Sequence, residues 1–305
     1  ILIKHAYVYT INKRFIKNGK INADELLVKN NITERVNETY NKIKRQIDEI
    51  LTLINQKEPP EISFAAKCLS YNICQLKDKC WEKLPDRNVF LLTGSDRWDI
   101  GNELINKNLY DLKDIPEDFP LNEKQKIQFD CELSGREHVD KTKISEFIST
   151  LKYPLYFLDF EATANMIIPV YDNTSSFQQI PYQFSLHIME NNKSKEKHYY
   201  FINPDQNDPR KRFIDKLIEL LGDTGSIVVY NSSFESRILS QTVNSCGISK
   251  SWLNNIIKRF FDLSIPFENY YYYHPNQNGK VSLKTILPIL TGHSYSNLNI
   301  GEALD

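Results

Sequence analysis

The chain has 305 residues, 41% of them hydrophobic and 25% charged, and its formal net charge is −1. This composition excludes an intrinsically disordered chain and excludes nucleic-acid binding through a bulk positive field, so any such binding requires a local patch or bridging metal ions. No apolar run reaches the roughly 18 residues that span a bilayer, and the N-terminus lacks a signal-peptide pattern, so we expect a cytoplasmic protein with no membrane partner.

The first part of the chain begins with an alternating strand-like run, HAYVYTIN, and continues into a helical pattern. The apolar residues that define one face of that helix are Val36, Ile43, Ile47, Ile50, Leu51 and Ile54. We expect Pro59–Pro60 to end the helix, because proline cannot continue it. A cysteine-rich segment and a helical connector over about residues 98–145 follow.

The second half changes to aromatic and β-branched runs. LYFLDFEA, YQFSLHIM and KHYYFINP are separated by polar turns and indicate an antiparallel meander. A helix from Pro209 that stops near Gly222, the strand SIVVYN, a helix through SFESRILSQTV, a helix near 251–260 and the helical VSLKTILPIL follow. This order predicts an α/β, ribonuclease-H-like mixed sheet with flanking helices, preceded by a mostly helical part with a cysteine cluster.

Asp159 and Glu161 stand two residues apart in the first of these strands. Side chains at i and i+2 share a face of a strand, so the two carboxylates project together and repel each other unless a cation neutralises them. Mg²⁺ or Mn²⁺ suits such ligands, and a pair of these ions is the usual device for attack of water on a phosphodiester. The alternative is a solvated or salt-bridged pair.

Glu235 follows the strand SIVVYN in the sequence VVYNSSFES. The strand is expected to end at Tyr230 and a helix to begin after Asn231 or Ser232, which places Glu235 in the first helical turn, where the helix dipole favours negative charge. The alternative is that Glu235 only caps the helix in a box with Ser232.

These motifs resemble the DEDD, or DnaQ-like, 3′–5′ exonuclease superfamily over residues 153–305. Its first motif, D-x-E, corresponds to residues 159–161, and its second, usually H-N-x-x-F-D, corresponds to Y-N-S-S-F-E at 230–235, with Glu in place of Asp. PLYFLDFE, QQIPYQFSLHI, VVYNSSFES and SLKTILPIL also resemble an uncharacterised bacterial family in which such a domain follows a RecB-like iron–sulfur nuclease segment.

The superfamily's last motif, a Tyr or His a few residues before a final Asp, has no match in the sequence. Gly301 stands four residues before Asp305, and Ile300 stands five before it. We therefore expect the last motif, with the fourth carboxylate and the general base, to lie beyond Asp305, which leaves open whether the chain as given is active. Asp262, in RFFDLS, is a secondary metal candidate or a residue that positions backbone.

Other polar and aromatic residues are weaker candidates for substrate binding. The set consists of Gln178, Gln179, Gln183, His187, Asn231 and His274. The alternative for the glutamines and His187 is ordinary polarity on an edge strand. The aromatic cluster at 270–273 offers rings for base stacking, but we expect it to pack against the sheet.

Three cysteines, Cys68, Cys74 and Cys80, are spaced as C-x5-C-x5-C. Thiolates this close in a reduced compartment usually bind zinc or an iron–sulfur cluster, and the alternative is three buried free thiols. The segment resembles the cysteine cluster of RecB-family nucleases, which implies a [4Fe–4S] cluster whose fourth cysteine lies upstream. The cluster site in this chain is then incomplete. Cys131 and Cys246 would bring the number of cysteines to four or more, but nothing in the sequence around them supports either as the missing ligand.

The resemblance implies three regions: residues 1–90, the end of a RecB-like segment; residues 91–150, a helical connector; and residues 151–305, a truncated exonuclease domain. It implies a metal-dependent 3′–5′ exonuclease that hydrolyses DNA or RNA at single-stranded ends by a two-metal mechanism, with Asp159, Glu161 and Glu235 as ligands. One alternative is a catalytically silent nucleic-acid-binding module of a repair or defence complex, and another is a hydrolase of small phosphoesters.

Overall fold

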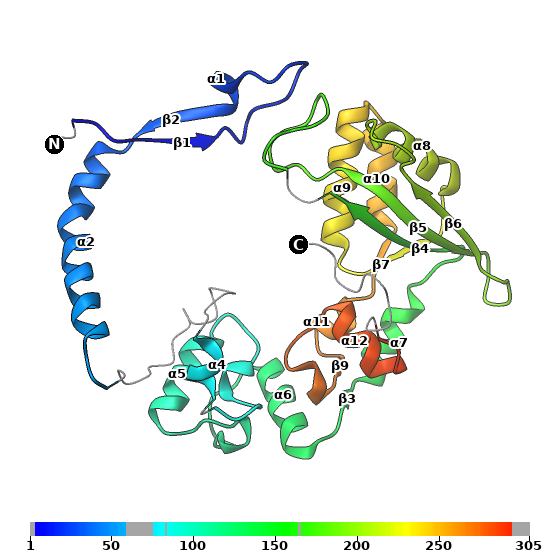
Figure 1. Cartoon of the computed structure of the whole chain (residues 1–305). Helices are drawn as coiled ribbons and strands as arrows, with labels where there is room; N and C mark the ends of the chain where they lie inside the picture. The colour runs from blue at the N-terminus through cyan, green and yellow to red at the C-terminus, as the bar shows by residue number, and fades with distance from the viewer. Residues whose placement is uncertain (1–3, 59–75, 83, 164–165, 295–305) are drawn as a thin grey trace.

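The computed structural model describes residues 4–58, 76–82, 84–163 and 166–294 (Figure 1). Its largest unit is a five-stranded mixed sheet with strand order β6-β5-β4-β7-β8. The strands are β4 (Leu155–Ala162), β5 (Pro181–Met189), β6 (Lys197–Ile202), β7 (Ser226–Val229) and β8 (Phe260–Asp262).

The direction of the strands decides which residues meet at each edge of the sheet. β5 runs antiparallel to both β4 and β6, whereas β4, β7 and β8 are parallel to one another. The register pairs Phe157 with Val228 and Val229 with Asp262. The carboxyl ends of β4, β7 and β8 therefore lie along a common edge, which is where ligands bind in many open α/β sheets.

One face of the sheet is covered by α8 (Arg210–Leu220), α9 (Ser232–Cys246) and α10 (Lys250–Lys258), which lie together against it in Figure 1. Residues of the strands and of these three helices form the main core. Its fully buried members include Phe184, Leu186, Phe213, Ile214, Leu217, Ile227, Ile238, Leu239 and Val243. Burying each such side chain contributes about 1.5–3 kcal/mol, so this core fixes the strand register.

The N-terminal part consists of a hairpin and a long helix. β1 (Tyr7–Ile11) pairs antiparallel with β2 (Leu27–Asn31), the short α1 (Ala23–Leu26) lies between them, and α2 (Thr33–Ile54) follows. No side chain of α2 is buried. The loop after β1 reaches the sheet unit, where Ile16 bridges Ser175 and the Lys17 amide donates to the Thr174 carbonyl over 2.9 Å.

The part between α2 and the sheet holds a second, smaller core, formed by Val89, Leu92, Leu104, Leu112, Ile115 and Phe129. Its elements are α4 (Lys77–Trp81), α5 (Arg97–Asn106), α6 (Glu123–Ser134), β3 (His138–Val139) and α7 (Lys141–Ser149), with 3₁₀ turns at 89–91 and 112–114. After β8 come α11 (Ile265–Glu268), β9 (Tyr272–Tyr273), a 3₁₀ turn at 275–277 and α12 (Leu283–Thr291). β9 pairs with β3.

The structure confirms the mixed α/β class, the three meander strands and the helices that follow them. α8 ends at Leu220 with Leu221 as its C-cap residue, next to the expected stop at Gly222. One expectation about packing is wrong. Tyr270 and Tyr273 are buried against Ile127 and Cys131 of α6, not against the sheet. Pro59–Pro60 lies outside the described residues, and α2 ends at Ile54.

Among the described helices, none combines the length and apolarity that crossing a bilayer requires.

Candidate functional site

Strand β4 separates its side chains between the two faces of the sheet. Tyr156, Leu158 and Phe160 enter the main core, while Asp159 and Glu161 alternate with them and are exposed on the opposite face. The apolar residues fix the strand in this orientation, because turning it over would expose three large side chains. The two carboxylates thus share one face, as the spacing predicts.

Protein atoms around the end of β4 disfavour charge on both residues, although each remains open to solvent on one side. Partial removal of water raises the pKa of Asp159 above its ordinary value. The same cause raises the pKa of Glu161, and the neighbouring negative charge of Asp159 adds to it. Two partly desolvated carboxylates, one of which hinders the ionisation of the other, are suited to sharing a cation.

Glu235 enters the site from the first turn of α9, and its side chain is only 4% exposed. Its Oε2 atom is buried without a hydrogen-bond partner among the described residues. Burial, with a smaller contribution from the negative charges of Asp159 and Asp262, raises the pKa of Glu235 to about 7. A buried carboxylate with an unpaired oxygen is costly, and a bound cation would remove that cost.

Asp262, at the end of β8, fixes the turn that carries Glu235. Its Oδ1 accepts from the amides of Asn231 and Ser264, each at 2.9 Å, and its Oδ2 accepts from the amide of Ser232 at 2.7 Å. Burial acts against the charge of Asp262, but these hydrogen bonds outweigh it and lower the pKa. Asp262 therefore positions backbone, and its role as a secondary metal ligand stays a prediction.

α9 begins after Asn231, as expected, and Asn231 is its N-cap residue. Asn231 adopts the left-handed conformation with φ of 66°, and its side chain makes no capping hydrogen bond. The Asn231 side chain instead accepts from the Ser233 hydroxyl over 2.6 Å. The Asp262 carboxylate, from a neighbouring strand, replaces the local cap. Glu235 is consequently not held in a box with Ser232, and its carboxylate stays available.

The four carboxylates gather at one edge without forming a ready-made metal cluster. Within the described ranges, no group of three or more His, Cys, Asp or Glu side chains is placed to hold a metal ion. The donor set itself fits a hard cation, since it consists of carboxylate oxygens with one buried and unpaired. Mg²⁺ or Mn²⁺ would have to draw the side chains of Asp159, Glu161 and Glu235 together on binding.

The weaker candidates divide between two places. Gln183 lies directly opposite Glu161 in the β4–β5 register, on the face that carries the carboxylates. His187 lies on that face too, opposite Phe157. Gln178, by contrast, accepts from the Ser175 amide over 3.0 Å and so shapes its own loop. Gln179 is half-buried in the same loop, just before β5.

His274 and the tyrosines near it belong to another part of the molecule. The His274 Nδ1 accepts from the Asn276 amide over 3.1 Å, and its own amide donates to Gln277 over 2.7 Å, so it caps a 3₁₀ turn. Tyr270 and Tyr273 stack on each other at 4.6 Å between ring centroids. Among the described residues, no hydrogen bond, ion pair or ring contact connects His274 with the carboxylates.

The cysteines remain separate wherever they are described. Cys80 lies in α4, Cys131 is buried in α6 and Cys246 ends α9 against the main core. Burial raises the pKa of Cys131 to about 11, so it stays a neutral thiol. Cys131 and Cys246 therefore pack as apolar residues. Cys68 and Cys74 lie outside the described residues, and the predicted cluster stays a prediction.

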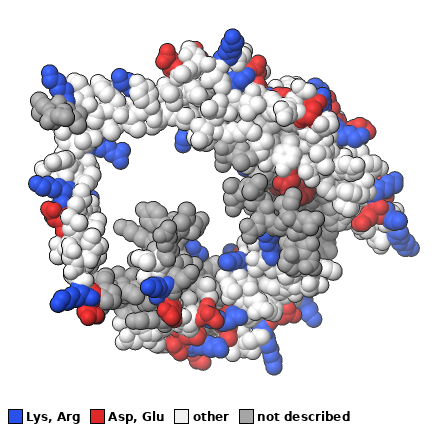
Figure 2. Space-filling model, in the orientation of Figure 1, with Lys and Arg blue, Asp and Glu red and all other residues white. Residues whose placement is uncertain are grey.

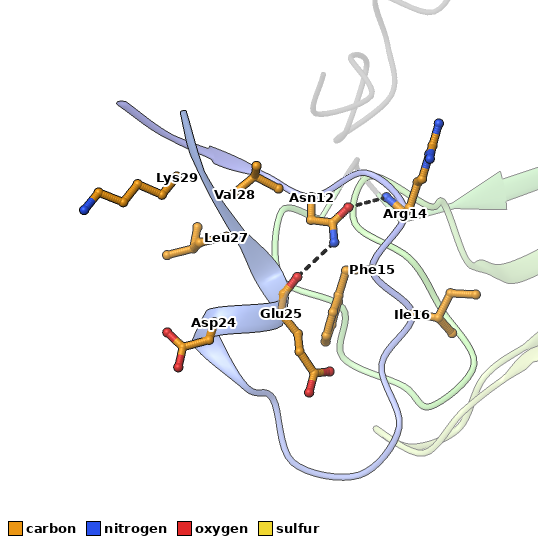
Figure 3. A pocket seen from close by; sticks show the side chains of 9 residues that line it. All are labelled: Asn12, Arg14, Phe15, Ile16, Asp24, Glu25, Leu27, Val28 and Lys29. Carbon is orange, nitrogen blue, oxygen red and sulfur yellow. Dashed lines mark hydrogen bonds between the residues drawn. The ribbon is translucent and has the colours of Figure 1, made fainter. Parts of the chain in front are cut away.

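An open hollow of about 550 Å³ lies elsewhere, in the N-terminal hairpin (Figure 3). Asn12 spans it, donating to the Glu25 carbonyl over 2.9 Å and accepting from the Arg14 amide over 3.0 Å. No predicted site residue lines this hollow. Figure 2 shows basic and acidic side chains interspersed around the molecule, without a continuous basic stripe on the face in view.

Comparison with known proteins adds one match. Residues 156–282 match the model of a family described as a domain of unknown function, DUF2779. The match starts in β4 and ends before α12, and it includes Asp159, Glu161, Glu235 and Asp262. No curated protein matches the chain.

Proposed function

We propose that this chain carries a metal-dependent nuclease site, which hydrolyses phosphodiester bonds at the 3′ end of single-stranded DNA or RNA. The observation that carries the proposal is that Asp159 and Glu161 lie near the end of β4 and Glu235 follows the neighbouring strand β7, so that the negative charge of Asp159 acts on both glutamates. Strand β4 positions Asp159 and Glu161, and the turn after β7 positions Glu235. The Asp262 carboxylate accepts hydrogen bonds from two amides of that turn and so holds it in place; we call this set of hydrogen bonds the Asp262 clamp.

The unpaired oxygen of Glu235 is the second support. If Glu235 had only a structural role, we would expect both of its carboxylate oxygens to accept hydrogen bonds, because most buried polar atoms in proteins are hydrogen-bonded. Glu235 instead lies beside two further negative charges, with its Oε2 buried and unpaired among the described residues. Such a site is under strain as apoprotein, and a divalent cation relieves both the repulsion and the missing partner.

The order of the strands also supports a ribonuclease-H-like fold for this unit. Three meander strands are followed by strands that alternate with helices, and β4, β7 and β8 present their carboxyl ends together. In this arrangement Asp159, Glu161 and Glu235 would hold Mg²⁺ or Mn²⁺. When bound, such ions polarise the phosphate and favour ionisation of the attacking water.

A catalytically silent nucleic-acid-binding module is the second candidate, and two observations favour it. The described carboxylates form no ready metal group, and Asp262, the nearest fourth carboxylate, already accepts three backbone hydrogen bonds. In that case the same edge would position a nucleic acid without cutting it.

Hydrolysis of an end-labelled single strand distinguishes the two candidates. We expect the wild-type chain to shorten a 5′-labelled oligonucleotide from its 3′ end with Mg²⁺ or Mn²⁺ and to leave it intact with EDTA. Asp159→Asn should slow this by about 100-fold or more, the scale on which one charge-stabilising group acts. Asp48→Asn, an exposed carboxylate of α2, is the matched control. Binding without shortening in either metal would contradict the nuclease and favour the silent module.

A further inference from the structure

The face of the sheet that carries Asp159 and Glu161 continues across β5 and β6. Directly paired residues of antiparallel strands share a face, so the register defines three rows. They run from Phe157 through His187 to His198, from Asp159 through Ser185 to Tyr200, and from Glu161 through Gln183 to Ile202. We name the β5–β6 part of these rows the sheet platform: Gln183, Ser185, His187, His198, Tyr200 and Ile202.

The platform is the side of the sheet that the main core does not use. The intervening residues, such as Phe184 and Leu186, enter the core under α8 and α9. Tyr200 is 67% exposed and Ile202 is 54% exposed. A tyrosine this open contributes little to folding, which leaves its ring face available to a ligand.

The aromatic rings of the platform contact one another. His187 and His198 stack at 4.2 Å between centroids with an angle of 14°, and the His198 Nε2 lies 3.0 Å from the Ser185 hydroxyl. The ring of Tyr200 lies 6.0 Å from that of His198. Because strand pairing and these contacts order the side chains in advance, a flat ligand would lose little entropy in stacking on them.

We propose that this platform stacks the unpaired bases next to the 3′ end of a single strand whose terminal phosphodiester lies at the carboxylates. The platform is continuous with the carboxylate edge, and Tyr200 lies in the same row as Asp159, two strand spacings or about 10 Å away from it. Aromatic residues on a sheet face stack two or three bases in other proteins. The inference rests on the proposed function for the position of the cleaved bond.

The charge of the molecule favours stacking over phosphate contacts. The net charge of the chain is −1, so the molecule as a whole has no excess of positive charge that would attract phosphates. A protein that binds through many phosphate contacts uses a positively charged surface and loses affinity steeply as salt rises. Binding through base stacking requires unpaired bases and depends less on salt, so single strands should bind better than duplexes.

The test measures binding of a fluorescent single-stranded oligonucleotide by anisotropy in EDTA, where no cleavage occurs. Tyr200→Ala should weaken binding by roughly 5- to 150-fold, the range expected for one lost base stack. Tyr200→Phe keeps the ring and should bind as the wild type does. Tyr40→Ala is the matched control, because Tyr40 is 64% exposed but lies on α2. Thermal melting of each variant verifies its folding.

Equal binding by the wild type and Tyr200→Ala, no binding by the wild type, or equal weakening by Tyr40→Ala would each overturn the platform. Failure of the proposed function looks different, since binding would then depend on Tyr200 while no metal produced cleavage. Cleavage that Asp159→Asn abolishes, with binding unaffected by Tyr200→Ala, would retain the nuclease and reject the platform.

Discussion

The two faces of the five-stranded sheet use the same strands for different purposes. On the covered face, Phe184 and Leu186 are fully buried under α8 and α9. On the other face, their neighbours Ser185 and His187 remain partly accessible, beside the exposed carboxylates of β4. A period of two along each strand therefore separates residues that hold the fold from residues that are free to bind ligands.

Glu235 stands between these two environments. It belongs to α9, a helix of the covered face, yet the charges of Asp159 and Asp262 at the sheet edge act on its carboxylate and raise its pKa. The buried charge of Glu235 therefore lies where the two faces meet. The following predictions test that division, beginning with the covered face.

Phe184→Ala should lower the free energy of unfolding by about 3–5 kcal/mol, because it removes a ring packed between those of Phe201 and Phe213 and leaves a cavity. Ser185→Ala, the adjacent residue on the other face, loses one exposed hydrogen bond and should cost about 1 kcal/mol or less. Urea denaturation measures both. Similar losses at the two positions would remove the distinction between the faces.

Glu235 should make the stability of the metal-free protein depend on pH. Its folded pKa, about 7, lies above the ordinary 4.5, so the folded state binds this proton more tightly than the unfolded state. Ionisation of Glu235 therefore destabilises the folded state. This destabilisation is absent below the ordinary pKa, grows as pH rises between the two pKa values and is complete above the pKa of the folded state. Its full size is roughly 3 kcal/mol.

Urea denaturation in EDTA at several pH values should show this loss in the wild type and not in Glu235→Gln. Glu49→Gln, whose side chain on α2 is 66% exposed, should retain the wild-type profile. Addition of Mn²⁺ should restore stability to the wild type at the higher pH. If the wild type and Glu235→Gln gave the same dependence of stability on pH, burial would not be raising the pKa of Glu235.

Asp262→Asn should loosen the turn between β7 and α9. An amide oxygen cannot serve both sides of the carboxylate clamp, so at least one of the amides of Asn231, Ser232 and Ser264 loses its acceptor, at a cost of about 1.5–3 kcal/mol. Hydrogen exchange should accelerate at these amides. Asp140→Asn provides the comparison, since Asn also caps a helix well and α7 should be little changed. Unchanged exchange at all three amides would exclude the clamp.

Tyr200→Ala should have the smallest effect on stability, within about 0.5 kcal/mol, because the side chain is largely exposed. Thermal melting measures it beside the binding assay. A large loss would show that the ring supports the sheet.

Much of the sheet unit was predictable because its signals are local. The alternation in LYFLDFEA predicts both the strand and the shared face of Asp159 and Glu161, and the apolar run in SIVVYN predicts β7. The position of Glu235 follows from the end of that strand. These features depend on neighbours in the sequence, so a single sequence reveals them.

The misjudged features depend on partners far apart in the chain. The cap of α9 comes from Asp262, 30 residues beyond Ser232, and nothing near Asn231 indicates it. The tyrosines at 270–273 pack on α6 because β9 pairs with β3, a contact across more than 130 residues. Of the residues of the sheet platform, the sequence pointed only to Gln183 and His187, for the same reason. KHYYFI reads as a strand, but only the register places Tyr200 in line with Asp159.

Direct binding of Mn²⁺, followed through the electron paramagnetic resonance signal of the free ion, tests the central claim that the carboxylate edge is a metal site. We predict saturable binding by the wild type, loss of most of it in Asp159→Asn, and binding by Asp48→Asn equal to that of the wild type. Binding that survives Asp159→Asn unchanged, or no binding by the wild type, would contradict the account.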